Sequence, residues 1–361
     1  MNICFFFTGL STNGGIGRVT TLLANELVNR EDINIFLCTT YENSTGSKYY
    51  IDERIKYEFI FERSMSMFKA MLFHGGIYSL IKYIRRNKID IIVACGALYY
   101  PFATVAAKLC GIKVICWEHT DPYCKTDHKF QDQCRVFGAR LSDCNVLLTK
   151  KALDVYNKRF KRKRNIVITN FVDPKISSMN LPYRADSKMI ISVGRLNAQK
   201  NFSRLLDIAN MVMKRHPDWV WHVYGEGELR KSLEEKLNKL ELNDYVVFKG
   251  AVSDLYERYN RYSFMVMTSD YEGFPMTLLE GAASGLPLVA FDVPTGPSEI
   301  VLEQNGFLCE MFDINGMINA IEKLISDTNL RCELSDGSRD ISQHFEMTNI
   351  VNEWYELLKG I

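Results

Sequence analysis

The chain has 361 residues, of which 47% are hydrophobic and 24% are charged. This composition excludes disordered and fibrous proteins, and the length predicts two domains. No stretch approaches the roughly 20 consecutive apolar residues that a membrane-spanning helix needs, and the N-terminus lacks a basic leader, so we expect a cytoplasmic protein. The ten cysteines include no C-x-x-C pair and no cysteine–histidine cluster, so we expect reduced, structural thiols and no metal site.

The net charge of +1 hides an unequal distribution of charge along the chain. Residues 1–170 hold 25 Lys and Arg against 15 Asp and Glu, whereas residues 171–361 hold 19 against 28. The basic excess lies largely in residues 64–88 and in the run at 158–164, and it predicts an anionic surface as a partner of the first half. Nucleic acid is not favoured, because the run at 158–164 contains no aromatic residue beyond Phe160 and matches no nucleic-acid-binding motif.

Short apolar runs alternate with amphipathic helical patterns in chain order. A first series of expected strands is Ile3–Thr8, Ile33–Cys38, Ile89–Ala94, Lys113–Trp117, Asn145–Leu148 and Ile166–Thr169. A second series is Met189–Val193, Trp219–Tyr224, Val246–Lys249, Phe264–Met267 and Pro287–Ala290. Helices are expected at Gly17–Asn29, Asn201–Lys214, Leu229–Leu240 and Met276–Ser284. Such alternation predicts parallel sheets with helices on both faces.

The two series are separated by FVDPKISSMNLPYRADSK, a polar segment with Pro174 and Pro182 that is typical of an interdomain linker. The sequence therefore predicts an α/β protein with two doubly wound, Rossmann-like domains facing a central cleft. We expect the first domain at 1–172, the second at 173–344, and a C-terminal helix at 345–361 that returns to the first domain. Sheets of this kind bind ligands at the carboxyl ends of their strands.

A glycine-rich turn, TGLSTNGGIGRVTTLLANEL, follows the first expected strand. Gly14, Gly15 and Gly17 lead into a helix whose N-terminus can attract phosphate. The turn does not match the G-x-G-x-x-G register of dinucleotide-binding proteins, and it can equally be a structural connection. Arg18 is either a phosphate ligand or a solvated surface residue.

Two cations flank the turn after the strand that opens the second half. In SVGRLNAQKNF, Arg195 ends the strand segment and Lys200 precedes a helix. They suit a diphosphate, which needs fixed positive charge when no metal is present, although a pair of solvated loop charges explains the spacing equally well. Gly225 and Gly227, after the next strand, permit close approach of a ligand or form a tight turn.

The stretch EGFPMTLLE places two carboxylates, Glu272 and Glu280, with seven residues between them. Pro275 suits the start of a helix, which would leave Glu272 in the preceding loop and Glu280 inside the helix. The amides of Met276, Thr277 and Leu278 are then expected to face phosphate oxygens. One carboxylate can hold sugar hydroxyls and the other a ribose diol.

These segments together resemble the retaining GT-B-fold glycosyltransferases of family four, the glycogen-synthase-like group, and within it the enzymes that build bacterial surface glycans. The E-x7-E pair, SVGRLNAQKNF, TNGGIGR and VITNFVD resemble the family's segments in order and approximate spacing. Phe171 stands where the family usually has glycine. The likeness covers nearly the whole chain, and it implies the GT-B fold and retaining sugar transfer without a metal or other cofactor.

The resemblance also assigns roles to single residues. Arg195 and Lys200 would neutralise the donor diphosphate. Glu272 would bind the transferred sugar, and Glu280 the nucleotide ribose. Backbone at Gly15 and Gly17 would approach the phosphates.

Three further positions come from the same resemblance. His119, in WEHTDP, matches the family's active-site histidine, although a lone histidine is more often structural. Backbone near Gly250 is expected to recognise the base. The segment DVPTGPSEIV, with Glu299, is either a ligand-binding turn or an ordinary rigid one.

The donor is expected to be a UDP-sugar carrying a hexose or N-acetylhexosamine. The acceptor is expected to be a glycan, in particular a polyprenyl-diphosphate-linked oligosaccharide at the inner face of the cell membrane. An apolar stripe with interspersed cations in residues 64–88 suits contact with anionic lipid, but it also suits a helix packed on its own sheet. A sugar-nucleotide epimerase and a catalytically silent sugar-nucleotide binder remain as alternatives.

Overall fold

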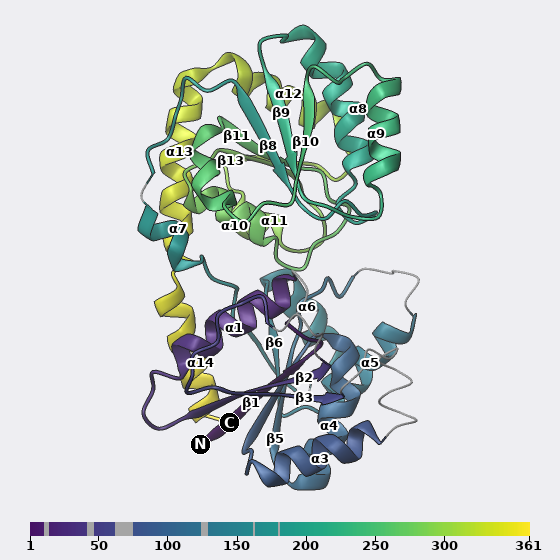
Figure 1. The fold of residues 1–361 in the computed structure, drawn as a ribbon, viewed down its shortest axis with the longest axis vertical. Helices are drawn as coiled ribbons and strands as arrows, with labels where there is room; N and C mark the ends of the chain where they lie inside the picture. Colours follow the sequence, from purple (N-terminus) through teal and green to yellow (C-terminus); the bar gives the residue numbers. More distant parts are fainter. Residues whose placement is uncertain (11–13, 42–46, 62–74, 124–128, 162, 180) are drawn as a thin grey trace. The chain divides into compact units, whose positions relative to one another are not determined.

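The computed structural model describes residues 1–361 except 11–13, 42–46, 62–74, 124–128, 162 and 180. The chain forms two compact units, one of Met1–Asn170 with Thr348–Ile361 and the other of Phe171–Met347. Each unit has its own parallel sheet with flanking helices (Figure 1). The predicted doubly wound architecture is therefore confirmed. Within the described residues, no helix has the length and apolar character required to span a membrane.

The first unit contains a seven-stranded parallel sheet in the order β3-β2-β1-β4-β5-β6-β7. Its strands are β1 (Asn2–Phe7), β2 (Asn34–Tyr41), β3 (Lys56–Phe61), β4 (Ile91–Cys95), β5 (Lys113–Trp117), β6 (Cys144–Leu147) and β7 (Arg164–Val167). Its helices are α1 (Gly15–Leu27), α3 (Gly76–Arg86), α4 (Tyr100–Cys110), α5 (Lys129–Leu141), α6 (Lys150–Arg159) and most of α14 (Met347–Lys359). The strand order reverses between β1 and β4, which is where such sheets bind ligands.

Both faces of the first sheet are covered by apolar side chains. On one face, α3 and α4 pack on inward-pointing strand residues such as Cys4, Phe6 and Ala94. On the opposite face, Phe5 and Trp117 pack against Trp354 of α14, with 4.6 Å between the ring centroids of the two tryptophans. The alternation of Phe5 and Phe6 between the two faces is the period-two pattern of a strand buried on both sides.

The second unit contains a six-stranded parallel sheet in the order β10-β9-β8-β11-β12-β13. Its strands are β8 (Met189–Val193), β9 (Val220–Tyr224), β10 (Val246–Gly250), β11 (Phe264–Met267), β12 (Leu288–Phe291) and β13 (Gly306–Cys309). Its helices are α7 (Pro174–Met179), α8 (Phe202–Val212), α9 (Arg230–Lys239), α10 (Met276–Ala283), α11 (Pro297–Ile300), α12 (Ile314–Ser326) and α13 (Thr328–Gln343). Here the order reverses between β8 and β11.

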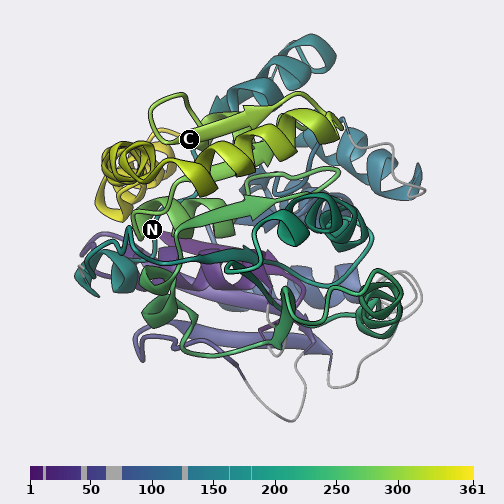
Figure 2. The ribbon, with the colours of Figure 1, turned by 90° about the horizontal axis from the view of Figure 1, so that it is seen from above.

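The helices of the second unit divide between the two faces of its sheet (Figure 2). Helix α8 packs against α9 and α12, whereas α10 packs against α13. A Cβ atom added at Gly281 of α10 would lie 2.9 Å from Met265 and 3.3 Å from Leu288, so α10 lies directly on β11 and β12. This close packing fixes the N-terminal end of α10 beside the carboxyl end of β11.

Two strands that the sequence did not predict, β3 and β13, lie at the edges of their sheets. Strand β3, KYEFIF, has polar residues at its first and third positions, and Phe59 is 46% exposed. Strand β13 has only four residues. The short run GFLC of β13 and the interrupted apolar pattern of β3 do not stand out as strands in the sequence.

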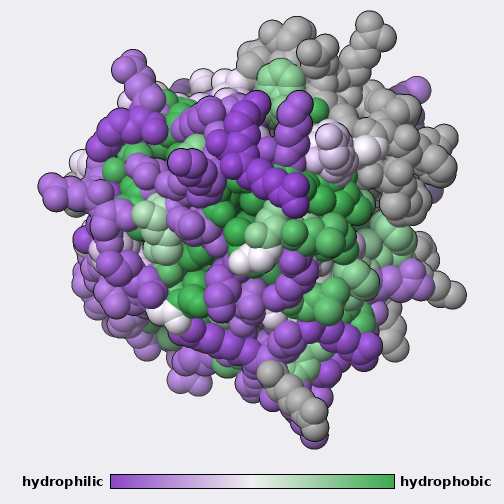
Figure 3. All heavy atoms as spheres, turned by 90° about the horizontal axis from the view of Figure 1, so that it is seen from below, coloured by the Kyte–Doolittle hydropathy of each residue, from purple (hydrophilic) through white to green (hydrophobic). Residues whose placement is uncertain are grey.

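The surface is not uniformly polar. On the face drawn in Figure 3, hydrophobic side chains gather in a patch that hydrophilic side chains border. Among the described residues of the first unit, large apolar side chains with more than a third of their surface exposed include Tyr78, Leu109, Phe137 and Leu141.

Candidate functional site

The loop after β8 carries Lys200, whose ammonium group meets the Glu272 carboxylate. Lys200 Nζ donates to Glu272 Oε1 at 2.5 Å, and the two side chains are only 16% and 6% exposed. The aliphatic part of Lys200 lies on Gly194, where an added Cβ atom would come within 3.1 Å of it. Arg195, in the same loop, is exposed. The structure thus brings together two of the predicted site residues, 72 positions apart in the sequence.

The loops after β8 and β11 are joined by several hydrogen bonds. The amide of Asp270 donates to Gln199 O at 2.9 Å, and Gln199 Nε2 donates to Tyr271 O at 2.9 Å. Asn201 adopts a left-handed conformation (φ 45°) and caps α8, while its Nδ2 donates to Asp270. These contacts hold Lys200 and Glu272 in register at the point where the strand order reverses. Sequence reasoning missed Asp270 and Asn201 because their pairing is visible only in three dimensions.

The N-terminus of α10 supplies amide donors next to Glu272. Pro275 occupies the N-cap position, and no side chain caps the helix. Of the three predicted phosphate ligands, the amide of Leu278 already donates to Pro275 O at 3.0 Å. The prediction for Leu278 is therefore corrected, because its N–H is used within the first turn. For the amides of Met276 and Thr277, no acceptor is found among the described residues, as expected for the open end of a helix.

Glu280 lies about one turn inside α10 and is buried. Only 3% of its surface is exposed, and its Oε2 accepts a hydrogen bond from the Tyr259 hydroxyl at 2.9 Å. A buried polar side chain is costly unless it is hydrogen-bonded, and the Tyr259 hydroxyl supplies such a bond. Tyr259 carries no sequence signal of its own, because it lies 21 residues from Glu280 in a short 3₁₀ segment (Leu255–Arg261).

The segment DVPTGPSEIV supports the loop that carries Glu272. Thr295 Oγ1 donates to the main-chain oxygen of Glu272. Gly296 has a φ of +96°, and a Cβ atom there would lie 2.6 Å from Pro275 Cδ. Thr295 and Gly296 therefore pack on the Glu272–Pro275 loop, and Glu299 lies in the short helix α11 that follows them.

The glycines that follow β9 are required by packing. A Cβ atom at Gly225 would lie 1.8 Å from Gly194 O, and one at Gly227 would lie 2.3 Å from Leu196 O. The loop after β8 thus lies in the space that the missing side chains of Gly225 and Gly227 leave. Gly250 at the end of β10 has a φ of +71°, and its main-chain oxygen accepts from the amide of Gly225 at 2.9 Å.

In the first unit, the predicted glycine turn forms the start of α1. Gly14 is the N-cap and Gly15 the first helical residue. A Cβ atom at Gly15 would meet nothing within 4 Å, whereas one at Gly17 would lie 3.2 Å from Leu10. Gly17 is therefore explained by packing, while nothing in the described structure requires glycine at position 15.

His119 follows β5 and packs on Trp117, with ring centroids 4.3 Å apart. Its Nε2 atom is buried and has no hydrogen-bond partner among the described residues. Burial lowers the pKa of His119 to about 4, although the nearby Glu118 carboxylate opposes this change. The imidazole is therefore neutral at neutral pH and can donate or accept a hydrogen bond.

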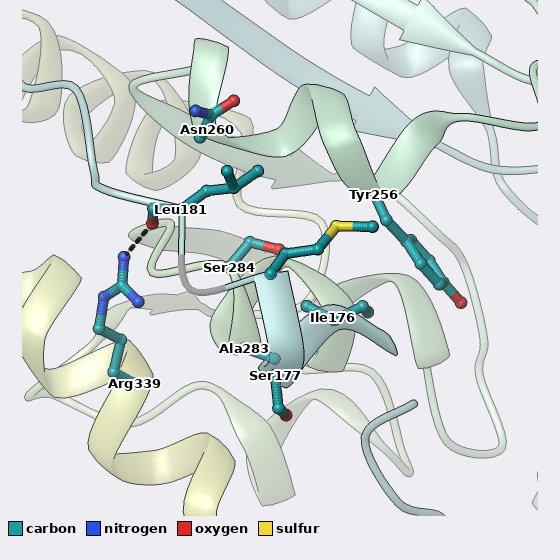
Figure 4. A pocket seen from close by; sticks show the side chains of 9 residues that line it. Ile176, Ser177, Leu181, Tyr256, Asn260, Ala283, Ser284 and Arg339 are labelled. Carbon is teal, nitrogen blue, oxygen red and sulfur yellow. Dashed lines mark hydrogen bonds between the residues drawn. The ribbon is translucent and has the colours of Figure 1, made fainter. Parts of the chain in front are cut away.

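A small cavity lies elsewhere in the second unit, between α7, the C-terminal end of α10 and α13 (Figure 4). Its lining includes Ile176, Tyr256, Ser284 and Arg339, and Arg339 donates to Leu181 O at 2.8 Å. With a volume of about 40 Å³, it is far smaller than a nucleotide site. None of the predicted site residues lines it. Within the described residues, no group of three His, Cys, Asp or Glu side chains is placed to hold a metal ion.

The second unit has the doubly wound parallel sheet of the GT-B type, with Lys200, Glu272 and the N-terminus of α10 at the point where its strand order reverses. Two family profiles match the chain: "Glycosyltransferase Family 4" over residues 13–176 and "Glycosyl transferases group 1" over residues 177–340. The chain therefore belongs to the family-four, group 1 glycosyltransferases, which are retaining enzymes of a metal-independent type that use nucleotide-sugar donors. The predicted family, fold and enzyme class are confirmed.

Relatives match over almost the full length of the chain. The amylovoran biosynthesis glycosyltransferase AmsD of Erwinia amylovora is 28% identical, with 97% of each chain covered. A Campylobacter jejuni enzyme, named as an α-1,4-N-acetyl-D-galactosaminyltransferase acting on a diphospho-undecaprenol-linked glycan, is 23% identical, with 100% of this chain and 99% of the relative covered. A crystal structure of a Staphylococcus aureus TarM mutant with UDP superimposes with a TM-score of 0.83 at 16% identity, covering 99% of each chain.

Proposed function

We propose that this enzyme transfers a hexose or N-acetylhexosamine from a UDP-sugar to a lipid-linked glycan during surface polysaccharide synthesis. Retaining transfer from a nucleotide sugar follows from the family, and the donor base, the sugar and the acceptor are the proposal. AmsD supports the pathway by its name, the Campylobacter enzyme supports a polyprenyl-diphosphate acceptor, and TarM supports UDP. The observation that carries the proposal is the Lys200–Glu272 pair beside the open N-terminus of α10.

The donor diphosphate is proposed to bind at the end of β8. Lys200 has three N–H donors, of which Glu272 engages one, so the ammonium group can hold Glu272 and a phosphate oxygen together. Arg195 adds a second positive charge from the same loop. The amides of Met276 and Thr277 would complete the phosphate site, because a helix N-terminus favours anions.

The two glutamates are proposed to orient the donor on either side of its diphosphate. Lys200 holds one oxygen of Glu272 in place, and the carboxylate can accept hydrogen bonds from hydroxyl groups of the transferred sugar. Glu280 would accept hydrogen bonds from the ribose hydroxyls, while the Tyr259 hydroxyl donates to its Oε2. Main chain near Gly250 would contact the base, and main chain at Gly15 would approach the phosphates.

Catalysis would depend on stabilising the charge that develops on the departing diphosphate. As the bond to the anomeric carbon breaks, fixed cations and amides stabilise the UDP leaving group more than the bound donor. The acceptor hydroxyl attacks from the same face, and the departing phosphate takes its proton. His119 is proposed to contact the transferred sugar, because its imidazole is neutral and its Nε2 has no partner among the described residues.

Membrane contact is proposed for the first unit, although not through the stripe predicted at 64–88. Residues 64–74 of that stripe lie outside the described structure. From residue 77 onward its apolar side chains, Ile77, Leu80, Ile81 and Ile84, belong to or pack against the core. For this part, the alternative of a helix packed on its own sheet holds in place of lipid contact. The sequence left both open because an amphipathic pattern is the same whether the apolar face meets a core or a lipid.

A different surface of the first unit suits an anionic membrane. Helix α5 exposes Phe137 and Leu141, which are 44% and 39% exposed, along a groove of about 460 Å³. Arg140, Arg159 and Asp132 border this groove, and Asp132 pairs with Arg159 at 2.8 Å. Exposed apolar side chains flanked by arginines are typical of proteins that rest on anionic headgroups. We propose that this face holds the enzyme at the inner surface of the cell membrane, near a lipid-linked acceptor.

The donor proposal is tested by thermal unfolding of the full chain against a panel of nucleotide sugars, because a ligand that binds only the folded state raises the melting temperature. UDP-sugars should raise it, and Lys200→Met should abolish the shift. Lys188→Met is a matched control, since Lys188 forms an exposed pair with Asp218 in the same unit. A shift with other nucleotide sugars only would refute the UDP assignment, and turnover of the donor without acceptor would favour an epimerase.

The membrane proposal is tested by co-sedimentation with vesicles of phosphatidylglycerol or phosphatidylcholine. We expect binding to the anionic vesicles, and we expect Phe137→Ser with Leu141→Ser to abolish it. Met211→Ser, at an exposed position of the second unit (51% exposed), is the control and should bind normally. Equal binding to both vesicle types would contradict the electrostatic part of the proposal.

A further inference from the structure

A buried carboxylate in the first unit ties together the residues on either side of His119. Glu118 is 2% exposed. Its Oε1 accepts from the amide of Thr120 at 3.1 Å and from the Thr120 hydroxyl at 2.6 Å. Since Glu118 and Thr120 directly flank His119, these two bonds close a tight turn around the histidine.

Two helices hold the same carboxylate from outside the turn. Arg135 Nε of α5 donates to Glu118 Oε2 at 2.7 Å, and the Tyr156 hydroxyl of α6 donates to the same oxygen at 2.8 Å. Arg135 also donates to Thr120 Oγ1 at 3.0 Å, which closes a ring of hydrogen bonds. We call Glu118, Thr120, Arg135 and Tyr156 the Glu118 network. Although burial opposes ionisation, Arg135 and these donors keep the pKa of Glu118 below its usual value.

Stability of the fold does not by itself explain the Glu118 network. Burying a carboxylate and a guanidinium, which are 2% and 5% exposed, removes both from water, and apolar residues of similar volume often stabilise a fold at least as well. What the network adds is a fixed main-chain geometry at residues 118–120. The turn itself, α5 and α6 each bind the Glu118 side chain. The residue held at the centre of that turn is His119.

The histidine side chain is held on its other side by aromatic packing. Its ring lies on Trp117, which in turn lies on Trp354 of α14. The imidazole therefore has a fixed position, yet Nε2 has no partner among the described residues. A buried polar atom that is held in place and left without a partner is costly unless a ligand completes it.

We infer that the Glu118 network positions the His119 imidazole for the reacting sugar. Glu118, Thr120, Arg135 and Tyr156 are thus positioning residues that act through His119 and do not touch the substrate. This inference rests on the proposed function, in which His119 contacts the transferred sugar. It adds that the histidine's activity depends on side chains from α5 and α6.

The test compares Thr120→Val with Thr120→Ser. Valine is close in shape to threonine but removes both hydroxyl bonds of the ring, whereas serine keeps the hydroxyl. Misplacing a reacting group by about 1 Å can cost on the order of 10²-fold in rate. We therefore expect Thr120→Val to lower kcat about 10- to 100-fold with little change in the donor KM, and Thr120→Ser to restore kcat. Thr104→Val, which removes a buried 2.6 Å hydrogen bond of α4, controls for lost stability.

A double-mutant cycle with His119→Ala separates positioning from a merely structural role. If the network acts through the histidine, Thr120→Val lowers kcat in the natural background and has no further effect in the His119→Ala background. Equal losses in both backgrounds would overturn the inference while leaving the histidine's role intact. An unchanged kcat in His119→Ala alone would refute that role in the proposed function, and the inference with it.

A second readout does not depend on turnover. In the full chain labelled with ¹⁵N-histidine, Tyr156→Phe and Thr120→Val should shift or broaden the imidazole signals of His119 without substrate, and Thr120→Ser should leave them in place. Imidazole signals that are the same in all variants would overturn the inference. Because Tyr156→Phe removes a single hydroxyl, this arm remains informative if Thr120→Val fails to fold.

Discussion

Breaking the Lys200–Glu272 pair tests whether this pair is a desolvated, preorganised unit. In Lys200→Met, the Glu272 carboxylate stays 6% exposed and loses the partner at 2.5 Å. Removing one member of a buried pair costs about 3–5 kcal/mol, because the other charge remains uncompensated. Lys200 is 16% exposed, so water recovers part of this loss, and we expect about 3 kcal/mol.

Adding Glu272→Gln to Lys200→Met should recover part of the loss, since the uncompensated charge is removed. We expect a coupling energy of about 2 kcal/mol from this double-mutant cycle. Hydrogen exchange measured by mass spectrometry at increasing urea is the appropriate assay, because it follows the second unit separately from the first. High salt should leave the coupling largely unchanged, since buried pairs are screened weakly.

The exposed Lys188–Asp218 pair provides the comparison, with side chains that are 57% and 54% exposed. We expect no measurable coupling there, as for most surface pairs. Equal couplings in the two cycles would contradict a desolvated Lys200–Glu272 pair. Loss of the Lys200–Glu272 coupling at 0.5 M salt, roughly the range where screening becomes short, would contradict it as well.

Three further changes have defined outcomes. Gly138→Ala places a Cβ atom 2.1 Å from Tyr100 Cβ. Thermal unfolding should therefore show that the folded state loses about 3 kcal/mol of stability or more from overpacking. An added Cβ atom at Gly14 or Gly15 would meet nothing within 4 Å, so Gly14→Ala and Gly15→Ala should both fold normally. Only Gly15→Ala should weaken donor binding in calorimetry. Equal donor affinities of the two variants would exclude phosphate approach at Gly15. Burial lowers the pKa of His119 to about 4 in the folded chain. As pH falls from 7 to 5, the histidine therefore binds a proton in the unfolded chain but stays neutral in the folded chain. The natural chain should therefore lose more stability over that interval than His119→Gln, and identical pH profiles would contradict the burial.

The sequence could predict that Lys200 and Glu272 lie close together, because its signals for their positions are local. Lys200 and Glu272 stand in turns that directly follow apolar strands, and Pro275 marks the start of α10. Once parallel sheets are inferred, the carboxyl ends of neighbouring strands must meet. The position of each charge along the chain therefore fixes its approximate position in space.

Features that depend on pairing in three dimensions could not be predicted. The bond between Tyr259 and Glu280 joins residues 21 apart, and that between Tyr156 and Glu118 joins residues 38 apart, with no shared motif. The amide of Leu278 was assigned to phosphate because the exact start of a helix, and hence its free amides, is not fixed by sequence. The stripe ending at Ile84 was ambiguous in the same way, since periodicity shows that a face is apolar but does not show what covers it.

The most direct test of the account is the affinity of the full chain for UDP in the presence of EDTA, measured by calorimetry for the natural protein and for Lys200→Met. We expect UDP to bind without added metal, and we expect Lys200→Met to weaken binding by about tenfold or more, because a charge-assisted bond to the diphosphate is lost. Equal dissociation constants for the two proteins would show that the diphosphate binds elsewhere and would contradict the site described at the end of β8.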